Sequence, residues 1–187
     1  MNANSPLGSY KVIHITGASG SGTTTLGRAI SRRCGHLHLD SDDFIWEQTD
    51  PMFTLMRERT ARQAMMWEAI EASDNCVISG SLVGWGDVFI PLFELVIYVS
   101  TPTEMRLKRL AEREYQRFGE RILHGGDMAA EHQSFMEWAA QYDEGGLDIR
   151  SARTHAQWLA ALDCPIVRLD GSVDIDESIA ILEGIVQ

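Results

Sequence analysis

The chain has 187 residues, of which 44% are hydrophobic and 23% are charged, and its formal net charge is −11. This length suits one domain with a sizeable core and is barely enough for two. The acidic balance argues against a nucleic-acid polymer as partner, because a phosphate backbone needs a basic surface, whereas a single nucleotide needs only a few well-placed cations.

The N-terminal stretch MNANSPLGSYK lacks the apolar run of a signal peptide, and the chain has no apolar stretch of roughly 18 residues that could span a membrane. We therefore expect residues 1–9 to form a flexible leader, and we expect no membrane partner. Cys34, Cys76 and Cys164 are far apart and show no C-x-x-C spacing. Such cysteines are typical of reduced thiols, so we expect a cytoplasmic protein.

The expected elements begin with a β-rich segment, Lys11–Thr16, which ends in a glycine-rich loop. Thr24–Arg33 follows with apolar residues at the three- and four-residue steps of a helix. A short strand, His36–Leu39, ends at the acidic turn DSDD. After a loop at residues 51–54, we expect a helix that runs to about Ala72.

The second half of the chain continues this alternation. Cys76–Ser79 is a third short strand, and Leu95–Val99 is a continuous apolar run typical of a strand buried on both faces. The sequence TPTE from Thr101 predicts a helix start, in which the threonine caps, the proline suits the first turn and the glutamate completes a capping box. That helix is expected to end near Phe118. The remaining elements are an irregular segment at 119–130, helices at 131–142 and 151–162 around a Gly-Gly break, a strand at 165–169 and a final helix.

Strands that alternate with helices predict an α/β fold, with a five-stranded parallel sheet covered by helices on both faces. We expect a single domain. Ligands of such sheets bind beyond the carboxyl ends of the strands.

The stretch GASGSGTTT, residues 17–25, carries the strongest functional signal. It matches the phosphate-binding pattern G-x-x-x-x-G-K-[ST], except that Thr23 stands at the lysine position. A glycine-rich turn between a strand and a helix presents backbone N–H groups to an anion, and Thr24 occupies the position whose hydroxyl would bind Mg²⁺. The expected nucleotide-binding residues are Gly17, Ser19, Gly20, Ser21, Gly22, Thr23, Thr24 and Thr25.

Two other interpretations of this loop remain open. It could be a merely flexible turn, or a dinucleotide fingerprint G-x-G-x-x-G that starts at Gly20, with Asp40 as the ribose-binding acid. The fingerprint requires glycine at position 25, where this chain has threonine.

A family resemblance is carried by the stretches GASGSGTTTLGR, HLDSDDFIW, TDPMFT, SGSLVGWGD, REYQRFGERI, GGD and VRLDG. In these stretches the chain resembles the bacterial adenylate-kinase-related P-loop proteins of the nucleoside monophosphate and shikimate kinase group. The resemblance covers nearly the whole chain from Lys11. It implies a core, a lid at about residues 113–153, an acceptor-binding segment, and phosphoryl transfer from ATP with Mg²⁺.

Thr23 departs from that family pattern, in which lysine contacts the transferring phosphates. Loss of one such charge-stabilising donor typically costs about 3–4 kcal/mol of barrier. Another cation would therefore have to replace the lysine in an active enzyme.

Arginines that could replace it recur at three- and four-residue steps, which places them on one face of a helix. They are Arg106, Arg109, Arg113, Arg117 and Arg121. Because lysine and glutamates are interspersed, a solvated, salt-bridged helix remains an alternative. The series runs into the glycine-broken RFGERILHGGD, where the related kinases have lid arginines, so Arg113 and Arg117 are the first candidates. Arg150 and Arg153 resemble the arginines on the far side of such lids.

The acidic turn supplies the expected catalytic carboxylates. Asp40 or Asp42 can hold Mg²⁺ or accept the proton of an acceptor hydroxyl. Turn chemistry alone is the alternative, since Asp and Ser suit turns. The strand at 76–79 ends without a carboxylate, which increases the need for Asp40 or Asp42. The predicted metal ligands are Thr24 and Asp40.

The acceptor is expected near the aromatic residues that follow the acidic turn. These residues and the nearby arginines are Phe44, Trp46, Phe53, Arg57, Arg59 and Arg62, with Trp85 as a further lining residue. Aromatic side chains with arginine suit a flat or anionic substrate, although core packing explains the aromatics equally well. The histidines show no metal-ligand spacing.

The sequence thus predicts a P-loop kinase, monomeric or homodimeric, that transfers the γ-phosphoryl group of Mg-ATP to a small acceptor such as a nucleotide, a nucleoside or another metabolite. The alternative is a catalytically weak nucleotide-binding module with a regulatory role, which would need neither lid arginines nor an acidic turn.

Overall fold

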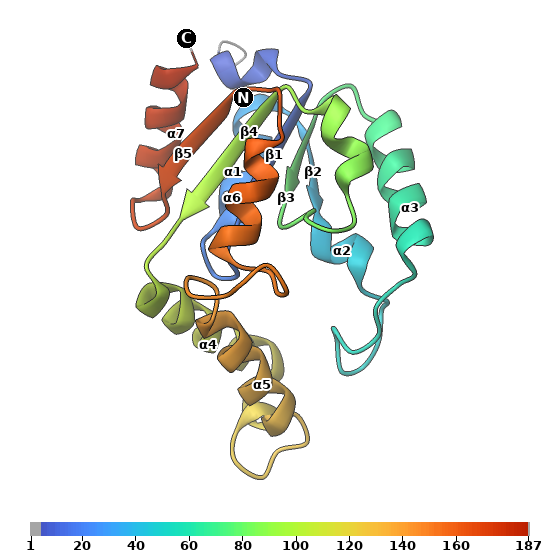
Figure 1. Ribbon diagram of the computed structural model, residues 1–187, viewed down its shortest axis with the longest axis vertical. Coiled ribbons are helices and arrows are strands. Elements are labelled where there is room, and N and C mark those ends of the chain that lie inside the picture. Colours follow the sequence, from blue (N-terminus) through green and yellow to red (C-terminus); the bar gives the residue numbers. More distant parts are fainter. Residues whose placement is uncertain (1–4, 187) are drawn as a thin grey trace.

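The computed structural model describes residues 5–186, and in this part of the chain five strands form one parallel sheet (Figure 1). The strands are β1 (Val12–Gly17), β2 (Leu37–Asp40), β3 (Cys76–Ser79), β4 (Leu95–Ser100) and β5 (Ile166–Asp170). Their spatial order is β2-β3-β1-β4-β5, so β1 lies in the centre of the sheet. The predicted α/β class and the five-stranded parallel sheet are confirmed.

Helices connect these strands and cover both faces of the sheet (Figure 1). One face is packed by α1 and α7, and the other by α3 and α6. The α-helices are α1 (Thr23–Cys34), α2 (Ser41–Ile45), α3 (Arg59–Glu71), α4 (Thr103–Phe118), α5 (Ala129–Ala140), α6 (Ala152–Ala160) and α7 (Ile175–Ile185). Short 3₁₀ helices are η1 (Pro6–Ser9), η2 (Asp87–Leu92) and η3 (Gly119–Ile122). None of the described helices is long and apolar enough to cross a membrane.

The strand sequences explain why the sheet is buried on both faces. In β1, Ile13 and Ile15 pack into the core under α1 and α7, while Val12 packs into the opposite core. All six residues of β1 are buried. Apolar side chains of the central strands therefore supply two cores, one on each face of the sheet.

The expected flexible leader is wrong where the structure describes it. Leu7 in η1 is completely buried in the core that contains α1 and α7. A single leucine beside a proline gives no periodic signal, and its burial depends on contacts with distant helices. Residues 1–4 of the expected leader lie outside the described residues.

The expected capping box at the start of α4 is also wrong. The N-cap is Pro102, and no side chain caps this helix. The buried Thr101 hydroxyl instead donates a hydrogen bond to the Ser21 carbonyl of the glycine-rich loop, at 3.1 Å. Thr101 therefore ties the end of β4 to that loop, a long-range contact that local sequence signals do not reveal.

Two segments project beyond the carboxyl ends of the strands (Figure 1). Residues 103–150, which we call the helical extension, contain α4, η3 and α5. Residues 46–57, which we call the hairpin, are closed by an antiparallel bridge between Trp46 and Met56. The segment 119–130, which was expected to be irregular, contains η3 at residues 119–122. The acidic turn that follows β2 forms the start of α2.

Candidate functional site

The glycine-rich loop lies between the end of β1 and the start of α1, as its sequence predicts. Gly20 and Gly22 have φ angles of 79° and 101°, a left-handed conformation that favours glycine. A Cβ atom at Gly17 would lie 2.5 Å from the Val99 carbonyl oxygen, so only glycine fits beside β4. No side chain caps α1, and its first turn contains no acidic residue. Its N-terminal N–H groups and helix dipole therefore suit an anion.

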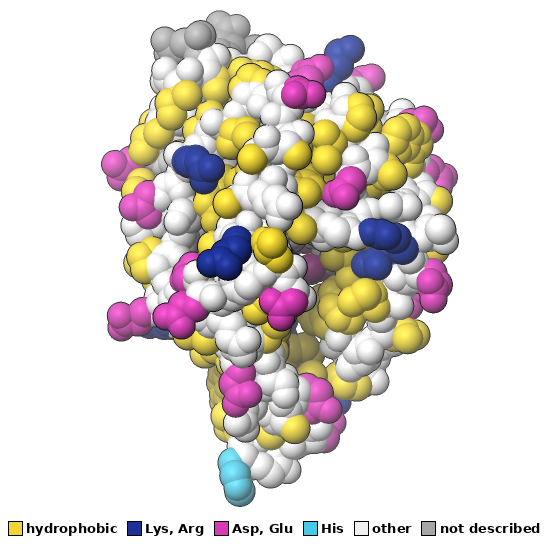
Figure 2. Space-filling model, viewed as in Figure 1, with side chains coloured by type: hydrophobic (Ala, Val, Ile, Leu, Met, Phe, Trp, Pro, Cys, Tyr) yellow, Lys and Arg dark blue, Asp and Glu magenta, His cyan; other side chains and the backbone are white. Residues whose placement is uncertain are grey.

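A cavity lies on each side of this loop. The main cavity has a volume of about 850 Å³ and is lined by Ser19, Thr23 and Thr24 together with the acidic turn and the helical extension. The second cavity has a volume of about 490 Å³ and is lined by Gly22, Thr25 and residues that follow β5. Figure 2 shows a hollow above the helical extension, bordered by hydrophobic side chains. The loop can therefore contact ligands in both cavities.

A hydroxyl and carboxylates meet at the floor of the main cavity. Thr24 Oγ1 donates to Asp40 Oδ2 at 3.0 Å, and the Asp42 amide donates to Asp40 Oδ1 at 3.2 Å. The structure thus brings together the predicted metal ligands Thr24 and Asp40, from α1 and β2. Oxygen donors of this kind suit Mg²⁺, which binds few protein side chains and keeps water and phosphate ligands. The described residues contain no cluster of three or more His, Cys, Asp or Glu side chains that could hold a metal by itself.

Asp42 lines the main cavity together with the predicted arginines Arg113, Arg117 and Arg150. Desolvation by the surrounding protein atoms and the charge of Asp40 raise the pKa of the Asp42 carboxyl, although the residue as a whole keeps an exposed surface. The positive charges of Arg150, Arg113 and Arg117 oppose this increase in pKa. A carboxylate whose pKa is raised accepts a proton more readily than an aspartate with the ordinary pKa.

Arg150 already contacts the glycine-rich loop. Its Nη2 donates to Ser19 Oγ at 2.5 Å, and its guanidinium lies 4.6 Å from the centre of the Trp138 ring. Burial lowers the pKa of Arg150, and its Nε is buried without a hydrogen-bond partner. Arg150 is thus held where it can reach an anion on the loop.

Arg113 and Arg117 line the same cavity from α4 and share one acidic partner. Arg113 Nη2 and Arg117 Nη1 lie 3.5 and 3.6 Å from Glu114 Oε1. Burial and the charge of Arg113 lower the pKa of Arg117. These long ion pairs leave guanidinium donors available to a ligand. Arg153, by contrast, is exposed and lines neither cavity, so the structure does not bring it to the predicted site.

The other arginines of the regular series have different environments, and a uniformly solvated helix does not describe them. Arg106 is completely buried and donates to the Thr101 and Ala139 carbonyls and to Asp143, which fixes α4 against α5. Arg109 lines the second cavity and donates to the Gly171 carbonyl at 2.9 Å. Arginines that are equally spaced along α4 therefore differ in role: some hold the fold together and others face a cavity.

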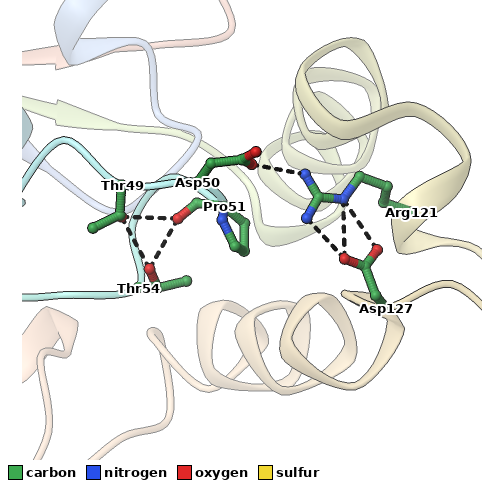
Figure 3. A network of polar contacts seen from close by, with 6 residues as sticks. All are labelled: Thr49, Asp50, Pro51, Thr54, Arg121 and Asp127. Atoms are coloured by element: carbon green, nitrogen blue, oxygen red, sulfur yellow. Dashed lines mark hydrogen bonds and ion pairs between the residues drawn. The ribbon is translucent and has the colours of Figure 1, made fainter.

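Arg121 joins the helical extension to the hairpin (Figure 3). Its guanidinium pairs with Asp127 of the extension at 2.8 Å and with Asp50 of the hairpin at 3.0 Å. The Arg117 guanidinium also lies 5.0 Å from the centre of the Phe53 ring of the hairpin. These contacts hold the two projecting segments together beside the main cavity.

The expected acceptor residues divide into two groups. Trp46, Phe53, Arg62 and Trp85 line the main cavity. Phe44, Arg57 and Arg59 do not line it: Phe44 belongs to the sheet core, Arg57 pairs with Glu47, and Arg59 donates to the Gly84 carbonyl. Core packing is thus the correct interpretation for Phe44.

Sequence reasoning missed the second cavity as a site and a buried histidine beside the main one. The stretch VRLDG, which ends β5, leads to the second cavity, where Gly171 packs against Ser21. His155 Nε2 lies 3.1 Å from the hydroxyl oxygen of Ser81, a residue that lines the main cavity. The family resemblance of VRLDG was a usable signal for the second cavity. His155 gave no such signal, because its partner Ser81 lies 74 residues away in the sequence.

The sheet order, the loop between β1 and α1, and the ligand-sized cavities at the carboxyl ends of the strands define a P-loop NTPase fold. The sequence model of a family described as an AAA domain matches residues 13–122, more than half of the chain. The chain belongs to this family.

Individual relatives include kinases. The chain is 38% identical to "Uncharacterized protein YqaC" of Bacillus subtilis over 90% of its length and 93% of the relative's. It is 31% identical to a cytidylate kinase of Thermococcus sibiricus over 55% of this chain and 57% of that protein. The shikimate kinase structure from Bacteroides thetaiotaomicron has a TM-score of 0.57 at 18% identity, covering 93% of this chain and 97% of that one. The deoxyadenosine kinase of M. mycoides has a TM-score of 0.53 at 15% identity, with 93% and 97% covered. The structural likenesses support the fold.

Proposed function

We propose that the protein is a phosphotransferase that moves the γ-phosphoryl group of Mg-ATP to a small acceptor. The observation that carries this proposal is the position of the glycine-rich loop between two cavities. Phosphoryl transfer requires two substrates to be held on opposite sides of the transferred group. The kinase names of several relatives support the same reaction class.

The donor nucleotide would bind with its base and sugar in the second cavity and its phosphates along the loop. Arg109, Asp170 and Ser172 line that cavity and supply polar groups for the nucleoside. The N-terminal N–H groups of α1 then lie between the nucleoside and the main cavity. This arrangement would direct the terminal phosphate toward Asp42 and the arginines.

Thr24 and Asp40 would hold Mg²⁺, because their oxygen atoms already lie together and suit a hard cation. The bound ion would supply charge neutralisation for the phosphate oxygens. Asp40 also caps α2 through the Asp42 amide, which fixes the carboxylate orientation.

In the reaction, an acceptor oxygen attacks the γ-phosphorus, the bond from that phosphorus to the β–γ bridging oxygen breaks, and ADP leaves with the electron pair. The proton of an acceptor hydroxyl passes to the Asp42 carboxylate. Its raised pKa suits that role. Acceptors that attack through a phosphate oxygen need no such base.

The arginines of the helical extension replace the charge that lysine would have supplied at position 23. Arg113, Arg117 and Arg150 line the same cavity as Asp42, and Arg150 donates a hydrogen bond to Ser19. Arginines that stabilise transferred phosphate contribute about 10³-fold or more to rate. The helical extension thereby acts as the lid, which expels water when it closes.

A catalytically weak nucleotide-binding module is the second candidate, and Thr23 is the observation that favours it. The two functions differ in what Mg-ATP binding leads to. A module would bind nucleotide without transferring its γ-phosphoryl group to any acceptor.

The test combines nucleotide binding with phosphoryl transfer. Calorimetry should detect Mg-ATP binding to the parent, and Thr24→Ala should weaken Mg-ATP binding much more than binding of metal-free ATP. Transfer of the labelled γ-phosphoryl group is then measured with nucleoside monophosphates, nucleosides and hydroxylated acids. If Thr24→Ala loses affinity equally for Mg-ATP and for metal-free ATP, Thr24 does not bind the metal. If the parent binds Mg-ATP but transfers its γ-phosphoryl group to no acceptor, the nucleotide-binding module is favoured. Arg32→Ala, at an exposed position on α1 away from both cavities, is the control.

A further inference from the structure

Arg150 reaches the glycine-rich loop from the segment that joins α5 to α6 (Figure 1). Its Nη2 donates to Ser19 Oγ at 2.5 Å, and its guanidinium lies 4.6 Å from the centre of the Trp138 ring. In the part of the chain that the structure describes, no carboxylate forms an ion pair with Arg150. The position of this cation therefore depends on Trp138 and on the backbone that carries it.

That backbone is closed by hydrogen bonds directly after Arg150. The Ala152 amide donates to the Tyr142 carbonyl at 2.8 Å, which joins the start of α6 to the end of the helical extension. Ser151, the next residue after Arg150, is the N-cap of α6 and accepts from the Thr154 amide at 3.1 Å. Contacts that hold Tyr142 and the start of α6 in place therefore also hold Arg150.

His155 of α6 supplies such contacts through both nitrogens of its ring. This residue is completely buried, and its Nδ1 lies 2.6 Å from the Tyr142 hydroxyl oxygen. Its Nε2 lies 3.1 Å from Ser81 Oγ and 3.3 Å from Thr16 Oγ1. Thr16 lies in β1 directly before Gly17, the first residue of the glycine-rich loop. The ring thus joins the closed segment to the end of the sheet from which the loop starts.

The polar nature of this contact favours a role in positioning over a role in stability alone. Apolar side chains of similar volume could fill the same space without the cost of desolvating polar groups. Hydrogen bonds require particular distances and angles, so bonds at both nitrogens fix the ring of His155 relative to the sheet and to Tyr142. Burial, and then the charge of Arg150, lower the pKa of His155 to about 4. At neutral pH the ring is therefore neutral, with one nitrogen that donates and one that accepts.

We propose that Tyr142 and His155 are positioning residues that hold Arg150 against the glycine-rich loop before a nucleotide binds. Neither Tyr142 nor His155 lines a cavity, so their effect on a ligand must pass through Arg150, which does. A cation that is already in place loses little freedom when the ligand arrives. The proposal rests on the proposed function in one respect, because Arg150 would there bind a phosphate of the nucleotide.

The first measurement needs no nucleotide. Phenylglyoxal modifies accessible guanidinium groups, and mass spectrometry of the digested protein gives the rate at each arginine. Arg150 should react at least threefold faster in Tyr142→Phe than in the parent, because the freed segment no longer holds it against Ser19 and Trp138. Arg153, which is exposed, should react at the same rate in both proteins and is the internal control.

Variants at position 155 separate hydrogen bonding from side-chain volume. His155→Leu removes both polar contacts and should raise the modification rate of Arg150 at least as much as Tyr142→Phe does. His155→Gln keeps a donor and an acceptor and should restore part of the parent's protection. Tyr98→Phe is the matched control, because it removes a hydroxyl 3.0 Å from that of Tyr142 but leaves the contact with His155, and it should react like the parent. If His155→Leu does not fold, Tyr142→Phe still tests the proposal, since it keeps the ring beside Arg106.

A double-mutant cycle shows whether the effect reaches the nucleotide through Arg150. Tyr142→Phe should raise the Kd for Mg-ATP at least threefold when Arg150 is present. In the Arg150→Ala background the same substitution should change this Kd by less than about 1.5-fold, because the guanidinium that Tyr142 positions is gone. A role confined to the stability of the fold would weaken Mg-ATP binding equally in both backgrounds.

The two measurements separate this inference from the proposed function. Unchanged modification of Arg150 in both Tyr142→Phe and His155→Leu would overturn the inference, as would an equal loss of Mg-ATP affinity in the two backgrounds. Either result leaves the phosphotransferase function intact. Faster modification in the variants of a parent that binds no Mg-ATP would support the positioning role and contradict the proposed function.

Discussion

At the scale of single residues, the site depends on charges whose values are set by their neighbours. Asp40 and Asp42 lie two residues apart, yet only Asp40 contacts Thr24. The raised pKa of Asp42 follows from desolvation by the surrounding protein atoms and from the charge of Asp40. One carboxylate is thus suited to a metal and the other to a proton, a division that sequence alone did not make.

Asp42→Asn should lower kcat for a hydroxyl acceptor by about 10²-fold or more, because removal of a general base typically has an effect of that size. Mg-ATP affinity should change little. In the parent, kcat/KM should fall as the pH drops through the raised pKa of Asp42, since the protonated carboxyl cannot accept a proton. Steady-state kinetics between pH 5 and 8 measure both effects. Asp43→Asn, whose side chain does not line the main cavity, should keep the parent profile, and a parent-like profile in Asp42→Asn would exclude the base role.

Thr23 gives the second prediction at this scale. Arg113→Ala should lower kcat strongly and change ATP affinity less, because its charge acts on the transferred group. Thr23→Lys added to Arg113→Ala should recover part of the lost kcat, since both side chains line the same cavity as the loop. A double-mutant cycle measures this coupling. Additive effects of the two substitutions would mean that lysine and arginine do not replace one another.

At the scale of elements, local signals predicted what depends on local sequence. The loop from Gly17 to Thr25 and the strand at 76–79 were found because glycine spacing and apolar runs report directly on backbone conformation and burial. The role of Thr101 was missed, because its partner Ser21 lies 80 residues away. Leu7 was assigned to a leader for the same reason: its burial requires the finished contact with α1 and α7. Candidate residues could be named from sequence, but their division between core, cavity and interface could not.

The arginines of α4 illustrate this limit. Arg106 and Arg113 are seven residues apart and carry the same charge, yet Arg106 is completely buried among carbonyl oxygens and Arg113 lines the main cavity. Helical spacing predicts which residues share a face of α4 but not which neighbouring element packs against each turn. In the structure, Arg106 contacts α5, and Arg109 contacts the loop after β5.

The contact between hairpin and extension makes a prediction at this scale. Asp50→Asn should raise KM for the acceptor by about two- to fivefold and leave Mg-ATP affinity unchanged, because it removes one exposed ion pair between the hairpin and the helical extension. Asp127→Asn removes the other partner of Arg121, which lies within the extension, and is the matched comparison. Acceptor saturation curves for both variants provide the measurement. A larger effect from Asp127→Asn would show that Arg121 acts by organising the extension rather than by holding the hairpin.

At the scale of the whole molecule, the sheet carries polar side chains as well as apolar ones through its buried centre. His14 of β1 stacks on Phe93 at 5.0 Å, and its Nδ1 donates to the Ile78 carbonyl at 3.2 Å. His155 of α6 contacts the hydroxyl groups of Thr16 and Tyr142. These contacts join β1, β3, α6 and the end of the extension into one buried network. Both imidazoles must remain neutral, because burial removes the water that a charged ring needs.

The stability of the molecule should therefore depend on pH. Burial lowers the pKa of His14 to about 3 and that of His155 to about 4, whereas an unfolded histidine titrates near 6.5. Above pH 6.5 both states are neutral and these residues contribute no pH dependence. As the pH falls below 6.5, the two histidines bind protons in the unfolded state but remain unprotonated in the folded state. The free energy of unfolding therefore decreases until the pH reaches the folded pKa values. Between pH 7.5 and 5.5 the two residues should together remove roughly 2–3 kcal/mol.

Urea unfolding of the parent and of His14→Phe at pH 7.5 and 5.5 measures this contribution. The variant keeps an aromatic ring beside Phe93 and removes one titrating group, so its loss of stability between the two pH values should be smaller than that of the parent by about 1–1.5 kcal/mol. Comparing the pH dependence within each protein separates proton uptake from any packing change, which is present at both pH values. His124→Gln, at an exposed position, should retain the parent's full pH dependence. If His14→Phe loses as much stability as the parent, the buried ring of His14 is not the group that takes up the proton on unfolding.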